Sequence, residues 1–301
     1  MKKFLPLFTF LFLSATFAQA QFFLGLRSSN YGGITNVNYN PAIADSRFIA
    51  DINLINFGFS AGNNYIGLDG KAITHPSIFS NFDKDVNLHE RLNGRAKNAY
   101  IGLQVQGPLS FMFSFGKKNK NAVAFSYHAN MVTNVDGIDQ TLSQIIYYGV
   151  GTKATPFFNQ SFSDRNIAIR TMAWADYGVT YSRVVLDQGE HMLKVGGTFK
   201  LLQGIGATYL YSKNIQYEWK NSETLSINNS DLNYGHSDNF NFTDNYKFKF
   251  NFDHAAPNFG GDAAVVYEWR PKKDKYKYEM DGVKDLYRKD KNLYMLQAGF
   301  S

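Results

Sequence analysis

The chain of 301 residues contains no cysteine, only seven prolines and, after its first twenty residues, no long apolar run. The lack of cysteine excludes disulfide bridges, thiolate catalysis and a lipid anchor on an N-terminal cysteine. A helix that spans a bilayer needs about 20 consecutive apolar residues, so none is predicted beyond the N-terminus. The folded chain must therefore be stabilised by a packed core or by contact with a membrane.

The first twenty residues have the layout of a secretory signal peptide. Lys2 and Lys3 form a basic start, an apolar stretch covers 4–13, and Ala18 and Ala20 complete a cleavage pattern. We therefore predict export and cleavage after Ala20. Without the two signal lysines, the mature chain has 29 basic and 25 acidic residues, a net charge of +4.

The clearest pattern in the mature chain is an alternation of apolar and polar residues over 99–115. One face carries Ala99, Ile101, Leu103, Val105, Leu109, Phe111, Phe113 and Phe115, and only Gly107, Pro108 and Met112 disturb the alternation. Strands of globular proteins usually span about 5–6 residues, so this strand is long. Its length and alternation are typical of a strand tilted across a bilayer, apolar towards lipid and polar towards a lumen.

Six strands are predicted, at about 48–60, 99–115, 122–133, 167–186, 192–204 and from 262, with a seventh from 293. An irregular phase over 49–55 predicts a bulge in the first strand, and Gly204 and Gly206 are expected to form a bulge or relieve crowding. The connections 116–121 and 187–191 are short, whereas 61–98, 134–166 and 205–261 are long. This alternation is typical of bacterial outer-membrane barrels, which have short periplasmic turns and long external loops. The connection 271–291 is an exception, about twenty residues where a short turn is expected.

The prediction is thus an all-β protein, an antiparallel transmembrane β-barrel over 48–301 in the bacterial outer membrane, with membrane lipid as its surroundings. Aromatic residues, at 16% of the chain, are typical of such barrels. Polar side chains of the inward face are the predicted lumen residues: Gln104, Gln106, His128, Asn130, Asp176, Lys194 and Lys200.

The predicted strand number is too small for closure. Single-chain bacterial barrels have an even number of strands and at least about eight. We therefore expect this sequence to be the N-terminal portion of a longer barrel. Closure by several chains, or a soluble β-sandwich, are the alternatives.

The segment before the first strand has a family resemblance. Tyr39-Asn-Pro-Ala-Ile-Ala44 resembles the Asn-Pro-Ala segment that opens barrels of the FadL-like fatty-acid transporter superfamily. With the segments 106–115 and 260–269, the chain more closely resembles a Bacteroidetes outer-membrane family of unknown function, the domain-of-unknown-function family 5723, whose members exceed 301 residues. The Gly/Ala-rich stretch that usually precedes Asn-Pro-Ala in fatty-acid transporters is missing here.

The resemblance implies that residues 21–47 form a small hatch that plugs the lumen. Pro41 fixes its own φ and favours extended geometry in the preceding residue, and nearby asparagines offer amides for hydrogen bonds to the lumen wall. The residues of this hatch motif are Asn36, Asn38, Asn40, Pro41 and Ala42. An ordinary N-terminal periplasmic loop is the alternative.

No catalytic, cofactor-binding or metal-binding pattern is found. The six histidines lack metal-ligand spacing. His128 has Ser126 and Asn130 as neighbours on one strand, which run parallel instead of converging as a catalytic set must. The basic residues between Arg270 and Lys291 are expected to form a solvated turn and not a nucleic-acid site. We therefore expect a protein that is not an enzyme.

Two functions remain. The first is FadL-like passage of a hydrophobic or amphipathic small molecule past the hatch. The second is a structural or interaction barrel that anchors surface loops or docks an outer-membrane assembly, with protein partners at the cell surface or in the periplasm.

Overall fold

The computed structural model describes residues 32–68, 88–148, 157–221, 224–237, 240–242, 248–250, 257–288, 291 and 293–301. The predicted signal peptide and residues 21–31 of the predicted hatch lie outside the described residues. In the described part the chain is mostly β-strand, as predicted, and one large antiparallel sheet dominates. No helix in these ranges is long and apolar enough to cross a membrane.

Ten strands form this sheet, and paired neighbours are antiparallel. The main path runs through β1 (Ala50–Asn53), β6 (Ser110–Phe115), β7 (Asn121–Ile138), β9 (Ile167–Gln188), β10 (His191–Trp219), β14 (Pro257–Trp269) and β17 (Leu296–Phe300). Beside this path, β5 (Lys97–Gln106) pairs with β7 and with β2 (Asn56–Asn63), and β11 (Leu225–His236) pairs with β10. Each of the seven predicted strands has its counterpart here.

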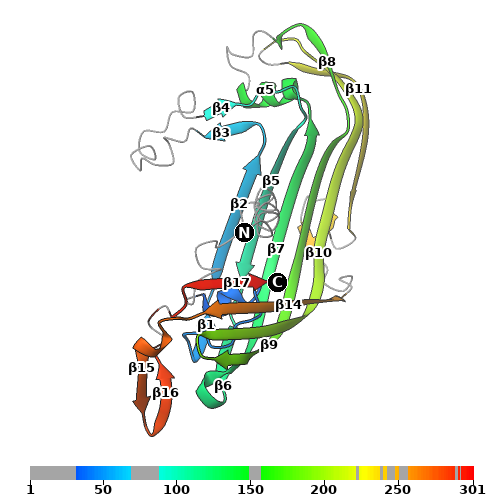
Figure 1. The fold of residues 1–301 in the computed structure, drawn as a ribbon. Helices are drawn as coiled ribbons and strands as arrows, with labels where there is room; N and C mark the ends of the chain where they lie inside the picture. The colour runs from blue at the N-terminus through cyan, green and yellow to red at the C-terminus, as the bar shows by residue number, and fades with distance from the viewer. Residues whose placement is uncertain are drawn as a thin grey trace.

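The sheet curls strongly along this path. In Figure 1, β2, β5 and β7 stand nearly upright, whereas β14 and β17 run almost horizontally across the lower part of the molecule. The short connections are as predicted: η4 (Lys117–Asn119) joins β6 to β7, and a tight turn at Gly189 joins β9 to β10. These turns lie at one end of the sheet, called here the short-turn end.

The first two predicted strands are each interrupted once, at the same level. Leu54 and Ile55 separate β1 from β2, and residues 107–109 separate β5 from β6. In an unbroken strand, residues an odd number apart point to opposite faces. Ile52 of β1 and Phe57 of β2 are five residues apart and are both exposed, so the break shifts the alternation between the two strands. The predicted irregularity at 49–55 is therefore confirmed as a break in the strand.

The fifth strand is much longer than predicted. Its expected end was Gly204, but β10 has 29 residues and continues to Trp219. The register with β9 shifts between Gly204 and Gly206, so these glycines form an irregularity within the strand and do not end it. Beyond this point β11 folds back along β10 as a hairpin partner.

Short elements fill the described parts of the long connections. They are β3 (Ile66–Leu68) paired with β4 (Leu88–Glu90), α5 (Gln140–Tyr148), β8 (Gln160–Asp164), and β12 (Phe240–Phe242) paired with β13 (Phe248–Phe250). The helix α5 was not predicted, since 134–166 looked like a polar loop. The connection after β14 contains η7 (Lys273–Tyr276) and a hairpin of β15 (Lys277–Met280) and β16 (Val283–Tyr287). This hairpin hangs below the sheet in Figure 1.

The two faces of the sheet differ in burial. Alternate residues of β7, β9 and β10 are buried, and the first described residues of the chain, 32–45, pack against that side. We call this side the covered face and the opposite side the open face. The open face carries large exposed apolar side chains, including Phe57, Phe199 and Phe259 with 68%, 60% and 71% exposure.

Candidate functional site

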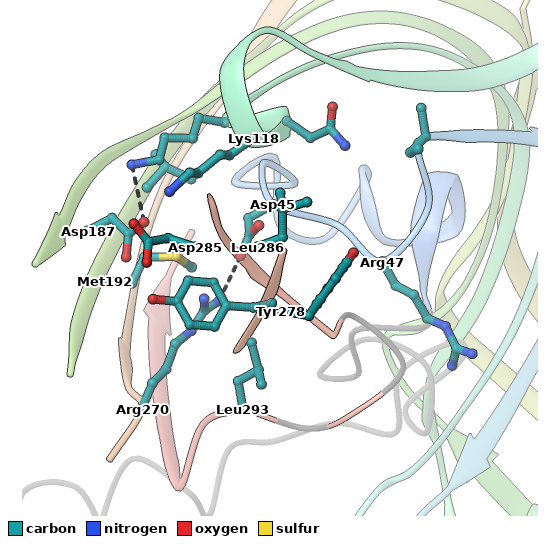
Figure 2. A pocket seen from close by; sticks show the side chains of 15 residues that line it. Asp45, Arg47, Lys118, Asp187, Met192, Arg270, Tyr278, Asp285, Leu286 and Leu293 are labelled. Carbon is teal, nitrogen blue, oxygen red and sulfur yellow. Dashed lines mark hydrogen bonds and ion pairs between the residues drawn. The ribbon is translucent and has the colours of Figure 1, made fainter. Parts of the chain in front are cut away.

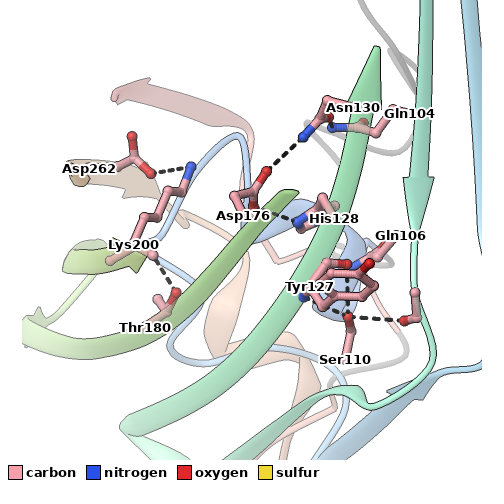
Figure 3. Close-up of polar contacts among 12 residues, drawn as sticks. Gln104, Gln106, Ser110, Tyr127, His128, Asn130, Asp176, Thr180, Lys200 and Asp262 are labelled. Atoms are coloured by element: carbon pink, nitrogen blue, oxygen red, sulfur yellow. Dashed lines mark hydrogen bonds and ion pairs between the residues drawn. The ribbon is translucent and has the colours of Figure 1, made fainter. Parts of the chain in front are cut away.

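Polar side chains of the covered side gather at two places. One is a pocket at the short-turn end, between the exit of the N-terminal segment and the β15–β16 hairpin (Figure 2). The other is a hydrogen-bonded network across β5, β7 and β9 (Figure 3). Both adjoin residues 32–45, called here the N-terminal segment.

The N-terminal segment packs on the covered face through small apolar groups. Ile34 and Val37, in and after η2 (Gly33–Asn36), join Ile43 in a buried cluster with β6 and β7. Further along, Ala42 contacts β14 and Ala44 contacts the ends of β9 and β10. The sheet residues in these clusters are Met112, Ala122, Ala124, Val184, Met192, Ala264 and Val266. Met112 interrupts the polar face of its strand in the sequence. In the structure the N-terminal segment covers this position, which accounts for an apolar side chain there.

One glycine allows the closest approach between the segment and the sheet. A Cβ atom on Gly196 of β10 would lie 2.1 Å from the carbonyl oxygen of Pro41, far inside contact distance. The adjacent Gly197 faces the other way, and a Cβ there would meet only the carbonyl oxygen of Asp262, at 3.6 Å. Gly196 therefore allows the segment to lie directly on the sheet backbone.

Hydrogen bonds also join the segment to the sheet. The Ile34 amide donates to Asp51 Oδ2 at 2.9 Å, and the Ala44 amide donates to Ser182 Oγ at 2.9 Å. Tyr39 donates its hydroxyl to Gln104 Oε1 at 2.9 Å. At the other end of the strand order, Ser301 Oγ donates to the Tyr39 carbonyl at 2.8 Å. The segment thus contacts both ends of the curled sheet.

The network in Figure 3 continues from Gln104 across three strands. Gln104 Nε2 donates to Asn130 Oδ1 at 2.9 Å, and Asn130 Nδ2 donates to Asp176 Oδ2 at 2.7 Å. Asp176 Oδ1 lies 3.0 Å from His128 Nδ1, and both side chains are buried. The register explains the contacts, because Gln104 is directly opposite Asn130 and His128 directly opposite Asp176.

The network has no catalytic geometry. Ser126 Oγ, two residues from His128, is buried and has no hydrogen-bond partner among the described residues. A serine nucleophile must be hydrogen-bonded to its base, and His128 uses Nδ1 for Asp176 without contacting that hydroxyl. No group of three or more His, Asp or Glu side chains in the described ranges could hold a metal ion.

A series of ion pairs links the covered face of β14 to the N-terminal segment. Lys194 Nζ lies 2.6 Å from Glu268 Oε1, and Glu268 is fully buried. Arg270 pairs with the other oxygen of Glu268 and, at 2.9 Å, with Asp45 Oδ2 of the segment. Buried charges of this kind are tolerated only when they are paired and hydrogen-bonded.

The remaining predicted lumen residues also lie on the covered face. Gln106 Nε2 donates to the Ile34 carbonyl at 3.4 Å and accepts from Asn56 at 3.2 Å. Lys200 pairs with Asp262 Oδ2 at 2.6 Å, and both side chains are partly exposed. The structure therefore brings Gln104, Asn130, Asp176 and His128 together and keeps Lys194 and Lys200 in separate ion pairs.

Among the predicted hatch residues, Asn40 uses its side-chain oxygen for a contact within the segment. Asn40 Oδ1 accepts from the Ala42 amide at 2.9 Å, which closes a local turn around the buried Pro41. The carbonyl of Asn36 accepts from the amides of residues 39 and 40. Asn38 Oδ1 is buried and has no hydrogen-bond partner among the described residues.

The expectation of a solvated basic turn is wrong for two of its residues. Arg270 and Lys273 are buried, at 5% and 8% exposure. Lys273 Nζ lies 2.6 Å from Asp187 Oδ1 of the neighbouring turn. The alternation of β14 could have indicated part of this, since Glu268 falls on the face opposite Tyr267 and Trp269. The distant partners Asp45 and Asp187 leave no local signal.

These features define an all-β protein in which one curled antiparallel sheet carries its own N-terminal segment on its polar face. Residues 41–279 match the model of a family of unknown function, DUF5723, and the chain belongs to this family. The resemblance to this family seen in the sequence is thereby confirmed, and the resemblance to FadL-like transporters stays a prediction. Comparison with curated proteins and with solved structures gave no match.

Proposed function

We propose that this protein is an outer-membrane β-barrel protein whose N-terminal segment plugs the lumen and regulates passage of an amphipathic solute. The observation that carries the proposal is the inverted polarity of the sheet. The face that is buried is polar and hydrogen-bonded, whereas the face that is exposed is apolar.

The open face has the character of a lipid-facing surface. Its exposed apolar side chains extend over neighbouring strands and not as isolated residues, and Phe199 stacks on Phe259 across β10 and β14 at 5.6 Å. Soluble proteins seldom expose such continuous apolar areas. In a β-sandwich the apolar faces are buried against each other, which is the opposite of the polarity found here.

Strand length and aromatic placement support the same proposal. A tilted barrel strand crosses a bilayer with about 9–11 residues, whereas β9 has 22 and β10 has 29. The strands are thus long enough to cross and to extend beyond the far surface. Near the short-turn end, His191 stacks on Tyr267 beside the partly exposed Trp269, as expected at a membrane interface.

The chemistry of the covered face favours an amphipathic solute over a hydrocarbon. Amide, imidazole and carboxylate groups line it at Gln104, His128 and Asp176, and small hydroxyls such as Thr180 and Thr198 lie nearby. A solute passing between this face and the N-terminal segment would need polar groups to replace those hydrogen bonds. The direct contact of Pro41 with Gly196 is the point at which the segment closes the route.

The test uses the native protein from an outer-membrane fraction, reconstituted into planar bilayers. We expect low conductance from the wild type and higher conductance from G196V, whose side chain must displace Pro41. G197V is the matched control, since its side chain points to the open face and should leave conductance unchanged. Recovery in the soluble fraction would overturn the membrane proposal, and equal conductance of the two variants would overturn the plug.

A second candidate function is surface interaction, and it rests on the far ends of the longest strands. There Ile145, Tyr217 and Trp219 form a buried cluster with partly buried aromatic residues around α5 and β8. A photo-crosslinker replacing the exposed Ile227 of β11 would capture a protein if this end docks a partner. The same crosslinker at Phe199 is the control and should capture lipid.

A further inference from the structure

The pocket in Figure 2 is built by parts of the chain that are distant in sequence. It has a volume of about 250 Å³. Its wall combines the exit of the N-terminal segment, the β6–β7 turn, the adjoining ends of β9 and β10, and the β15–β16 hairpin. Apolar side chains contribute as well as charged ones, among them Ile49, Val184, Met192, Leu286 and Leu293.

Specific contacts hold the hairpin side of the pocket in place. Lys273 pairs with Asp187 at 2.6 Å and lies over the ring of Tyr287, 4.7 Å from its centroid. The Arg270 amide donates to the Glu190 carbonyl at 2.6 Å, and its guanidinium pairs with Asp45. The hairpin is therefore fixed to both the neighbouring turn and the N-terminal segment.

The charges of the pocket are not balanced. Each acidic side chain in the wall already has a basic partner: Asp45 pairs with Arg270, and Asp285 pairs with Lys277. Asp187 has two partners, Lys120 at 3.1 Å and Lys273 at 2.6 Å. Burial works against ionisation of Asp187, but hydrogen bonds from these two lysines outweigh it and hold the pKa of the carboxyl below its usual range.

Lys118 adds a further positive charge. It lines the pocket beside Asp187 and Asp285 (Figure 2) and forms no ion pair within the described ranges. The backbone places it there, because Lys118 and Asn119 both have positive φ in the tight turn between β6 and β7. The lining charges and their ion-pair partners in this part of the molecule are six basic groups against four acidic ones, an excess of two positive charges: Arg47, Lys118, Lys120, Arg270, Lys273 and Lys277 against Asp45, Asp187, Glu268 and Asp285.

We propose that this pocket is a binding site for a phosphate group carried on a small or lipid-like body. A phosphate monoester has a charge of about −1.5 to −2 at neutral pH, which matches the excess. Its oxygens accept charge-assisted hydrogen bonds from lysine, and the apolar wall at Leu286 and Leu293 fits the group that carries the phosphate. The site does not depend on the proposed transport function.

The test is calorimetric titration of the full native protein in a non-ionic detergent at low salt. Inorganic phosphate is one probe, and water-soluble short-chain phosphatidic acid, a phosphate monoester, and phosphatidylcholine are the other two. K118Q should weaken binding about tenfold, the effect of losing one charge-assisted hydrogen bond. K272Q is the matched control, because Lys272 is exposed in the same basic region but does not line the pocket.

The outcomes separate the sources of the phosphate. Binding of inorganic phosphate that K118Q weakens and K272Q does not supports the site with a soluble ligand. Binding of phosphatidic acid alone, with the same response to K118Q, supports it with a lipid headgroup. The proposal is overturned if no probe binds, or if K118Q and K272Q have equal effects. Unchanged circular dichroism of both variants excludes misfolding as the cause.

Discussion

The two ends of the long strands are stabilised in opposite ways. At the short-turn end, buried charges of Lys194, Glu268, Arg270 and Asp45 link the sheet to the N-terminal segment. At the far end, Tyr217 stacks on Phe162, and Trp219 packs beside Phe158, in a mainly aromatic cluster. Loss of a buried charge should destabilise the short-turn end, and loss of side-chain volume should destabilise the far end. Single substitutions at each end can therefore test the comparison.

The largest expected effect is at Glu268. E268A leaves Lys194 and Arg270 buried without their shared carboxylate, and such loss costs about 3–5 kcal/mol of unfolding free energy. Urea unfolding of the detergent-solubilised protein measures it, with proteolysis of the N-terminal segment as a local readout. A cost below about 1 kcal/mol would show that these linked ion pairs do not stabilise the short-turn end.

A cavity at the far end should have a slightly smaller effect. W219A removes an almost fully buried ring from the aromatic cluster, and we expect a loss of about 3 kcal/mol. Hydrogen exchange should increase in β8 and the outer part of β10, while the N-terminal segment keeps its protease resistance. Release of that segment by W219A would contradict the independence of the two ends.

The sequence predicts the faces of these strands better than their partners. Alternation over 122–133 and 176–182 places His128 and Asp176 on one face, but their contact depends on the register set by the turns. The same limit applies to Arg270, because its partner Asp45 is 225 residues away in sequence. A run of basic residues has the same sequence pattern whether its side chains are solvated or buried.

The far end was harder to predict for a different reason. The fifth strand was expected to end at Gly204, but hydrogen bonds on both sides of the irregularity at Gly204 and Gly206 continue β10 to Trp219. The polar residues between Asn134 and Asn166 suggest a loop, and helix α5 forms there because Ile145 packs against Tyr217 and Trp219. Such packing depends on tertiary contacts that local patterns do not contain.

The two ends should also differ in their response to pH. Burial raises the pKa of Asp164 at the far end, although the amides of Asp139 and Arg165 donate to it at 2.7 Å. A raised pKa means that the folded state binds the proton more strongly, so this group favours folding increasingly as the pH falls from neutral. Asp187, with its lowered pKa, does the reverse and stabilises the fold above its unfolded pKa of about 4.

D164N and D187N test this contrast through urea unfolding as a function of pH. D164N should remove the gain in stability seen on mild acidification, and D187N should reduce the loss seen below about pH 4. Both variants keep the size of the side chain, so each serves as the control for the other. A common pH response of the two variants would sink the assignment of opposite pKa shifts to the two ends.

The smallest effect is expected from the exposed ion pair in the hairpin below the short-turn end. Lys277 pairs with Asp285, but both side chains are about half exposed, with 45% and 48% of their surface open to solvent. Surface pairs of this kind contribute little, because solvent screens the charges and ordering two side chains costs entropy. K277Q should therefore leave the urea midpoint unchanged, in contrast to E268A in the same part of the molecule. A clear shift of the midpoint would mean that the hairpin depends on its surface charges, and that burial is not what separates strong from weak ion pairs at this end.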